Sequence, residues 1–128
     1  MSFEGTVLLV DNGSSRPQST LSLRRLAAAL GERIGREVRP VSLMHADKVP
    51  AEALGGQPAD TFEPFLRREA EAGRRHLLVL PLFFGPSRAL SEFIPAKVET
   101  ASRDFGPVRL RVADVLCPLP GGEPRLTG

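Results

Sequence analysis

The stretch TVLLVDNGSSRP, residues 6–17, decides the fold of this chain. It begins as an apolar, β-branched run, which is typical of a strand buried on both faces. The run stops at Asp11, a short polar loop with one glycine follows, and Pro17 precedes a helical pattern of leucines and alanines. The stretch therefore predicts a strand, a loop and a helix in succession, the arrangement by which α/β proteins present a loop at an active-site edge.

The rest of the chain repeats this alternation. The further strands that we expect are residues 38–43, 76–82 and 108–112, and the helices are residues 19–34, 60–73 and 91–105, with a helical turn around residues 51–54. Ser19 is expected to cap the first helix, and Asp60 and Glu63 have the spacing of a capping box for the second. Pro40 places its strand near a sheet edge, while the very apolar strand 76–82 is expected to be central.

The order β-α-β-α-β-α-β predicts right-handed crossovers and a mostly parallel sheet of about four strands, with helices on both faces. We therefore predict a three-layer α/β fold. The 128 residues suit one domain, which we place at residues 3–120. A tail rich in proline and glycine, residues 121–128, is expected to be irregular.

Composition restricts the environment and the partners of the chain. A single cysteine, Cys117, excludes an intrachain disulfide framework, and the N-terminal apolar run is too short for a signal peptide or a membrane span. We therefore expect a cytoplasmic protein with no membrane partner. The formal net charge is only +2, and the arginines are scattered without interleaved aromatics, so no nucleic-acid partner is expected.

Polar residues follow each expected strand, and in open α/β sheets ligands bind beyond the carboxyl ends of the strands. These residues are Asp11, Asn12 and Ser14 after the first strand, Met44, His45 and Asp47 after the second, residues 83–89 after the third, and Asp114 and Cys117 after the fourth. His45 is suited to metal ligation or proton transfer near neutral pH. His76 begins its strand and so lies at the opposite edge. The chain has no metal or nucleotide motif, and we expect no cofactor.

Two segments together, LLVDNGSSRP (residues 8–17) and RRHLLVLPLFFGPSRALSEFIP (residues 74–95), resemble the small ATP-independent tetrapyrrole chelatases of cobalamin and siroheme synthesis, the CbiX-like sirohydrochlorin chelatases. The resemblance extends from residue 6 to about residue 120. It implies a flavodoxin-like, chelatase-like domain that pairs as a homodimer and builds a cleft between the two copies. It also implies the insertion of a divalent metal substrate (cobalt, nickel or iron) into a tetrapyrrole, with release of two protons.

The chain departs from the family pattern at the metal site. The resemblance implies that the two metal-holding histidines of the family fall on Asn12 and Ala89. An amide is a weak oxygen ligand and no useful base, and alanine offers neither function. A family glutamate falls near Met44, whose neighbour is His45, and a family acid lies one place from Glu92.

Three functions stay open. The first is a working chelatase with substitute ligands drawn from His45, Asp11, Glu92 and Asp47, in which Arg16 and Arg88 pair with the carboxylates of the tetrapyrrole. The second is a non-catalytic tetrapyrrole-binding protein or partner subunit, and the third is a small-molecule or anion binder that uses the amides around Gly13. The predicted catalytic residues are His45, Asn12 and Glu92, the predicted metal ligands are His45 and Asp11, and the predicted substrate-binding residues are Gly13, Ser14, Arg16, Phe84 and Arg88.

Overall fold

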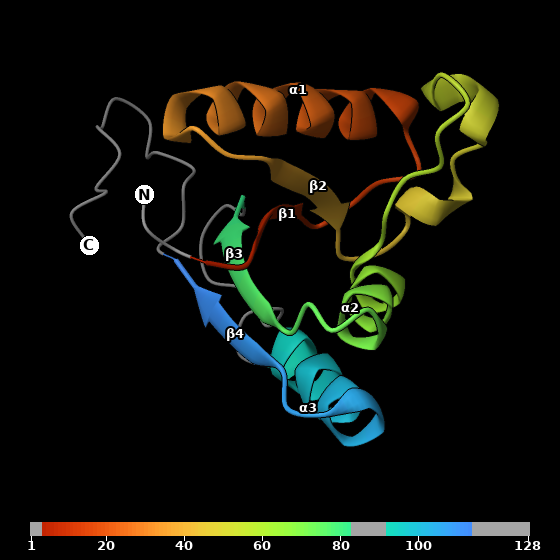
Figure 1. Ribbon diagram of the computed structural model, residues 1–128. Coiled ribbons are helices and arrows are strands. Elements are labelled where there is room, and N and C mark those ends of the chain that lie inside the picture. The colour runs from red at the N-terminus through yellow and green to blue at the C-terminus, as the bar shows by residue number, and fades with distance from the viewer. Residues whose placement is uncertain (1–3, 83–91, 114–128) are drawn as a thin grey trace.

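The computed structural model describes residues 4–82 and 92–113, which form a parallel sheet of four strands in the order β2-β1-β3-β4 (Figure 1). The strands are β1 (Thr6–Asp11), β2 (Val38–Ser42), β3 (His76–Pro81) and β4 (Arg109–Val112). β1 pairs with β2 on one side and with β3 on the other. The predicted edge position of the Pro40 strand and the central position of the 76–82 strand are both confirmed.

Helices cover both faces of this sheet, as predicted. They are α1 (Pro17–Ile34), α2 (Phe62–Glu71) and α3 (Ile94–Phe105), with two short 3-10 turns, η1 (Ala46–Lys48) and η2 (Ala51–Leu54), between β2 and α2. Figure 1 shows α1 on one side of the sheet and α2 and α3 on the other. The three-layer α/β prediction is therefore confirmed. Within the described part of the chain, no helix has both the length and the apolarity to span a membrane.

The core consists of two apolar layers that meet at β1. Residues 7–10 of this strand are each no more than 2% exposed. Successive side chains point to opposite faces of the sheet, and helices cover both faces. Leu8 and Val10 pack with Phe65 and other residues of α2 and α3. Val7 and Leu9 pack with residues of α1. This double burial explains the continuous apolar run in the sequence.

The predicted start of the first helix is wrong. α1 begins at Pro17, with Arg16 in an extended conformation at the N-cap, so Ser19 lies inside the first turn. Proline suits the first helical position because its φ is already helical and its missing N–H has no helical acceptor there. The helix therefore starts directly at the end of the loop that leaves β1.

The predicted capping box of the second helix is also wrong. Thr61 occupies the N-cap of α2 without a side-chain capping bond. The Asp60 carboxylate instead accepts a hydrogen bond from Nη2 of Arg68 at 2.6 Å. A nearby guanidinium is a stronger partner for a carboxylate than a backbone N–H. The charge of Asp60 is thus used in an ion pair on the surface of α2.

The third helix and the fourth strand agree with the sequence-based expectations. Pro95 lies in the first turn of α3, and Gly106 ends the helix with φ 109°. The helix begins at Ile94, whereas the expected start at residue 91 lies outside the described residues. β4 pairs with β3 in parallel, which completes the sheet.

Candidate functional site

The loops that leave β1 and β2 run together at the carboxyl edge of the sheet. The N–H of Leu43 donates to the carbonyl of Asp11 at 2.9 Å, and the N–H of Met44 donates to the carbonyl of Asn12 at 3.3 Å. The N–H of Leu82, after β3, donates to the carbonyl of Val10 at 2.7 Å. The strand-end rule therefore placed these segments correctly, and the backbone ladder continues beyond the strands into the loops.

Gly13 fixes the contact between these loops. Its φ is +94°, and a Cβ built on it would lie 1.8 Å from the carbonyl oxygen of Met44. Glycine adopts positive φ without steric cost and allows this close backbone approach. The predicted substrate-binding residue Gly13 is therefore also the residue that lets the loop after β1 lie against the loop after β2.

His45 has a strained backbone at the same edge. Its φ is 74°, and among the described residues it is the only non-glycine residue with positive φ. This conformation costs a side-chain-bearing residue about 1–2 kcal/mol. The carbonyl of His45 accepts a hydrogen bond from Lys48 at 3.0 Å, which starts η1, and the side chain is exposed. Such strain marks functional positions more often than ordinary loop positions.

Asp11 ends β1 with an incompletely satisfied carboxyl group. Its Oδ1 is buried and has no hydrogen-bond partner among the described residues. Burial raises the pKa of Asp11 above its usual range, although hydrogen bonds from the Ser42 hydroxyl and the Gly13 backbone act in the opposite direction. Ser42 pairs in register with Asp11 and is 2% exposed. The carboxyl group therefore lies in a polar but poorly solvated position at the end of the central strand.

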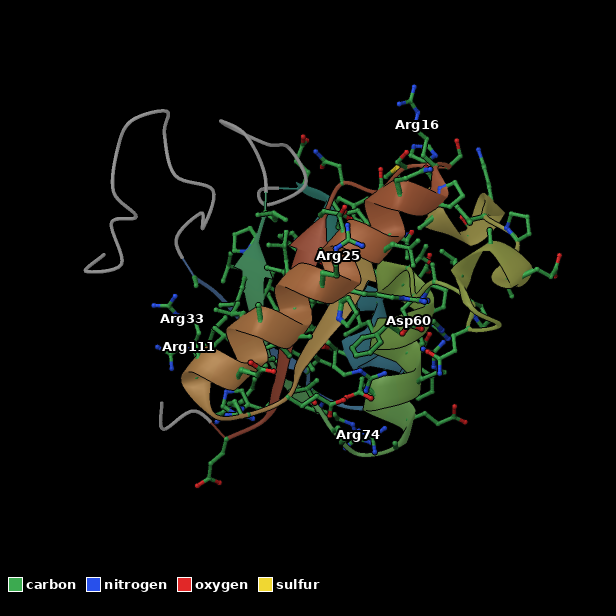
Figure 2. All side chains as sticks on the ribbon, turned by 90° about the horizontal axis from the view of Figure 1, so that it is seen from above. Arg16, Arg25, Arg33, Asp60, Arg74 and Arg111 are labelled. Atoms are coloured by element: carbon green, nitrogen blue, oxygen red, sulfur yellow. The ribbon has the colours of Figure 1, made fainter. Side chains whose placement is uncertain are left out.

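The remaining residues of the first loop present an amide and a guanidinium. Asn12 is exposed, as is Arg16 at the N-cap of α1. The Oγ of Ser14 accepts a hydrogen bond from the N–H of Arg16 at 3.0 Å, which shapes the approach to the helix. Within the described ranges Arg16 has no acidic partner, so its charge is available to a ligand. Figure 2 shows Arg16 at one end of the molecule and Arg74 at the other.

The expected set of substitute metal ligands does not form a cluster in the described part of the chain. No three histidine, cysteine, aspartate or glutamate side chains come close enough there to hold a metal ion. Glu92 is exposed just before α3. Phe84, Arg88 and Ala89, together with Asp114 and Cys117, lie outside the described residues. The predicted pair of His45 and Asp11 stays a prediction.

Ser42 is the residue of this site that the sequence-based reasoning missed. It is buried, and the hydrogen bond from its hydroxyl partly offsets the rise that burial causes in the pKa of the Asp11 carboxyl group. The available signal was the strand register. A polar residue at the end of the expected strand 38–43 lies beside the last residue of the neighbouring parallel strand.

Comparisons with known proteins agree with this architecture. The family model CbiX matches residues 6–121. A crystal structure described as a CbiX protein of cobalamin (vitamin B12) biosynthesis, from Marinobacter aquaeolei VT8, is similar in fold, with a TM-score of 0.62 and 21% sequence identity. The similarity covers 91% of this chain and 85% of that one. No curated protein is significantly similar to the chain in sequence. The match to the family model extends over most of the chain, which therefore belongs to the CbiX family.

Proposed function

We propose that this chain binds a tetrapyrrole at the carboxyl edge of its sheet, within the chelatase-like role in cobalamin biosynthesis that membership of the CbiX family supports. The exposed guanidinium of Arg16 pairs with a peripheral carboxylate of the ligand. The loop from residue 11 to residue 14 supplies the amide of Asn12 and the carboxyl group of Asp11 at the same edge. The domain proposed to do this comprises residues 3–120, in the cytoplasm.

His45 is the single observation that carries this proposal. Its backbone is strained, and glycine would hold the same conformation at lower cost. An exposed imidazole on a strained turn beside the loop of Asn12 is explained if the imidazole has a function there. Imidazole suits cobalt, nickel and iron as a ligand, and it exchanges protons near neutral pH. His45 therefore stands in for the histidine that the family pattern places at residue 12.

In this proposal the divalent metal is a substrate, and a second copy of the chain completes the site. One domain of this size offers one wall of a cleft for a macrocycle, and a twofold axis supplies the other wall. Each copy contributes one His45, so the dimer presents two imidazoles. The metal exchanges its water ligands for the pyrrole nitrogens, and the two pyrrole protons pass to His45 side chains and then to water.

A non-catalytic tetrapyrrole-binding function is the second candidate. It is favoured by the amide at Asn12 and by the finding that, in residues 4–82 and 92–113, no three metal-binding side chains cluster. In this case the edge still binds the macrocycle through Arg16 and the loop backbone, but the affinity does not depend on cobalt.

An absorbance titration of sirohydrochlorin with the purified chain tests both candidates. The titration is made first without metal and then with cobalt, for the wild type, His45→Ala and the control His76→Ala at the opposite edge. The chelatase is supported if the wild type shifts the ligand bands and accelerates cobalt insertion, and if this acceleration is lost in His45→Ala and retained in His76→Ala. Binding without faster insertion supports the second candidate. No spectral change at either stage overturns the proposal of tetrapyrrole binding.

The variant Asn12→His tests for a gain of cobalt-insertion activity. It restores the residue that the family pattern has at this position, on a loop that is already positioned against Met44. If the edge binds a tetrapyrrole, this variant accelerates cobalt insertion relative to the wild type. Unchanged insertion in a variant that still binds sirohydrochlorin shows that the edge does not present residue 12 to the ligand centre.

A further inference from the structure

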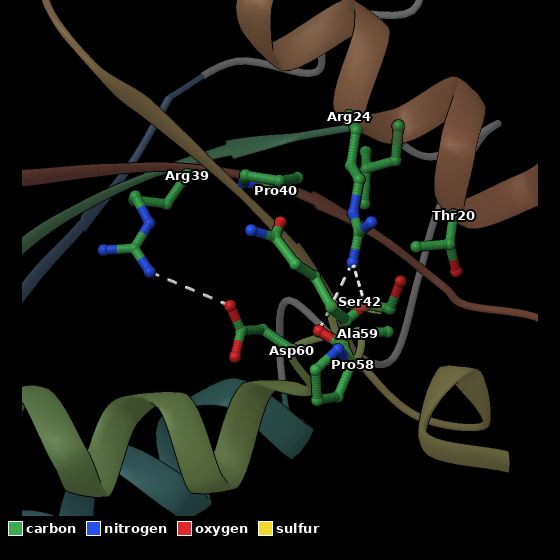
Figure 3. Close-up of a pocket in the computed structure, with 10 residues that line it drawn as sticks. Thr20, Arg24, Arg39, Pro40, Ser42, Pro58, Ala59 and Asp60 are labelled. Carbon is green, nitrogen blue, oxygen red and sulfur yellow. Dashed lines mark hydrogen bonds and ion pairs between the residues drawn. The ribbon is translucent and has the colours of Figure 1, made fainter. Parts of the chain in front are cut away.

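A separate cavity of about 270 Å³ lies beside the edge strand β2. α1 contributes Thr20 and Arg24 to its lining, β2 contributes Arg39 and Ser42, and residues 57–60 close the remaining side. Figure 3 shows Arg24 reaching from α1 toward this segment, while Arg39 approaches Asp60 from the β2 side. The cavity is distinct from the strand-end site and touches it only through Ser42.

The sequence explains why this space stays open. Residues 58–61 approach the outer side of β2, where the N–H of Ser42 donates to the carbonyl of Asp60 at 2.9 Å and a single bridge joins Ser42 to Thr61. Further upstream Pro40 has no N–H to donate, so the pairing cannot continue along β2. The segment therefore diverges from the strand and leaves a cavity between the strand and α1.

The cavity lining carries excess positive charge. The guanidinium of Arg24 donates to the carbonyls of Leu54 at 3.1 Å, Gln57 at 2.8 Å and Pro58 at 3.3 Å. These neutral acceptors do not compensate its charge, and within the described residues Arg24 has no acidic partner.

Arg39 is only loosely paired. Its guanidinium is 3.8 Å from the Asp60 carboxylate, which lies much closer to Arg68, at 2.6 Å. Its other acidic neighbour, Glu37, is 3.9 Å away. Two guanidinium groups and one shared carboxylate are thus the charged groups that line the cavity.

Two buried hydroxyl groups add polar character. Thr20 is 4% exposed, and its Oγ1 has no hydrogen-bond partner in the described part of the chain. Ser42 is 2% exposed. The lining is therefore polar as well as positively charged, which suits an anionic ligand.

We propose that this cavity binds the carboxylate group of a small organic acid between Arg24 and Arg39. A planar carboxylate matches the paired N–H groups of a guanidinium. The lining has two guanidinium groups and one carboxylate, and this net positive charge favours an anion over a neutral group. The volume equals that of about nine water molecules at about 30 Å³ each, which is too small for a macrocycle and sufficient for an acid side arm or a small free acid.

The carboxylate has two sources, a free small acid or a peripheral arm of a tetrapyrrole bound at the neighbouring edge. The second source rests on the proposed function. Ser42 makes it geometrically reasonable, because this residue lines the cavity and also contacts the Asp11 carboxyl group.

The test is an NMR titration of the ¹⁵N-labelled full chain with succinate, with dimethyl succinate as the neutral control. We expect a saturable shift of the Arg24 Nε–H signal with succinate alone. Arg24→Gln should weaken succinate binding roughly tenfold or more, because a charge-assisted bond is lost. Arg25→Gln is the matched control, since the neighbouring Arg25 is exposed and bonds to Ser22 instead. The Arg25→Gln variant should bind succinate with unchanged affinity.

Two more variants guard against a folding artefact at Arg24, which also holds the 54–58 segment. Ala59→Leu fills the cavity and keeps every hydrogen bond of Arg24, so it should abolish succinate binding. Thr20→Val replaces a buried hydroxyl whose oxygen is not accessible from the cavity, so it should leave succinate binding unchanged. The proposal is overturned if succinate causes no saturable shift, or if Arg24→Gln and Ala59→Leu bind succinate as the wild type does.

Competition between succinate and sirohydrochlorin identifies the source of the carboxylate. If succinate and sirohydrochlorin compete, the carboxylate belongs to the tetrapyrrole, and if both bind together it belongs to a free acid. Succinate binding in a chain that does not bind sirohydrochlorin refutes the proposed function alone. Sirohydrochlorin binding without any succinate site refutes the cavity proposal alone.

Discussion

The two ends of β1 each have an acidic side chain nearby, and these two groups differ in how fully they are hydrogen-bonded. At the amino end Glu69 of α2 is 4% exposed. It accepts hydrogen bonds from Thr6 at 2.8 Å and from Arg74 at 3.0 and 2.9 Å. At the carboxyl end Asp11 has a buried oxygen without a partner in the described residues. Glu69 is satisfied by its neighbours, whereas Asp11 is not.

The pKa values of the two groups move in opposite directions. Burial raises the pKa of Glu69, but the bonds from Arg74 and Thr6 outweigh this effect and lower it overall. For Asp11 burial dominates, and the pKa is raised. The amino end of the sheet is therefore built for stability, while the carboxyl end keeps strained and unsatisfied groups. Functional sites commonly keep such groups at the expense of stability.

The largest expected effect is that of Gly13→Ala, which tests whether the two edge loops are locked together. The new Cβ would lie 1.8 Å from the carbonyl oxygen of Met44, and alanine disfavours φ +94°. We expect the free energy of unfolding to fall by about 3 kcal/mol or more, and ligand binding at the edge to be lost. Chemical denaturation measures the change.

Gly35→Ala is the control for this prediction, because Gly35 has φ +76° and nothing within 4 Å of an added Cβ. It should cost only about 1 kcal/mol. Equal costs for the two variants would show that the contact with Met44 does not matter.

Glu69→Ala tests the satisfied end of the strand. It leaves the Thr6 hydroxyl without its acceptor, and we expect a loss of about 2–3 kcal/mol at pH 7. Because the pKa of Glu69 is lowered in the folded state, its charge stabilises the fold above the unfolded-state pKa and ceases to do so as pH falls through the folded-state pKa. The cost should therefore shrink in acid. Glu71→Ala, at an exposed position of α2, should change stability by less than about 0.5 kcal/mol.

Asp11→Asn tests the unsatisfied end, and the expected sign is opposite. The folded-state pKa of Asp11 is raised, so between the unfolded and folded values the folded chain binds more protons, and stability falls as pH rises. Removing the charge should raise the free energy of unfolding by about 1 kcal/mol at pH 8 and change it little at pH 3. Asp47→Asn, at an exposed position, is the control and should change the free energy of unfolding by less than about 0.5 kcal/mol at pH 8. A loss of stability in Asp11→Asn at pH 8 would contradict the contrast between the two acids.

His45→Gly gives the smallest expected change in stability. Glycine relieves the backbone strain at φ 74°. The free energy of unfolding should therefore stay the same or rise by up to about 1 kcal/mol, as measured by chemical denaturation. Binding of sirohydrochlorin or insertion of cobalt should weaken at the same time. His45→Ala separates the two effects, since it removes the imidazole and keeps the strain. Unchanged ligand handling in both variants would show that His45 is only a turn residue.

Much of the fold is encoded locally and was predictable from the sequence. The double burial of β1 follows from its unbroken apolar run, and the edge position of β2 follows from Pro40. The caps at Ser19 and Asp60 were mispredicted because neighbouring residues in the sequence had a stronger effect. Pro17 set the start of α1, and Arg68, on the next helix, took the Asp60 carboxylate.

The edge of the candidate site was predictable, but its energetics were not. The strand-end rule assigned Asp11 and His45 to the same edge. The missing partner of Asp11 depends on tertiary packing, and the pattern of polar and apolar residues around His45 gives no sign of its positive φ.

The most direct test of this contrast is an amide chemical-shift map of the ¹⁵N-labelled chain on addition of sirohydrochlorin. We expect large shifts in residues 11–16 and 43–47 at the carboxyl edge. We expect no change at Thr6, Glu69 and Arg74 at the amino end. Shifts concentrated around Glu69 and Arg74, with none in the two edge loops, would contradict this contrast.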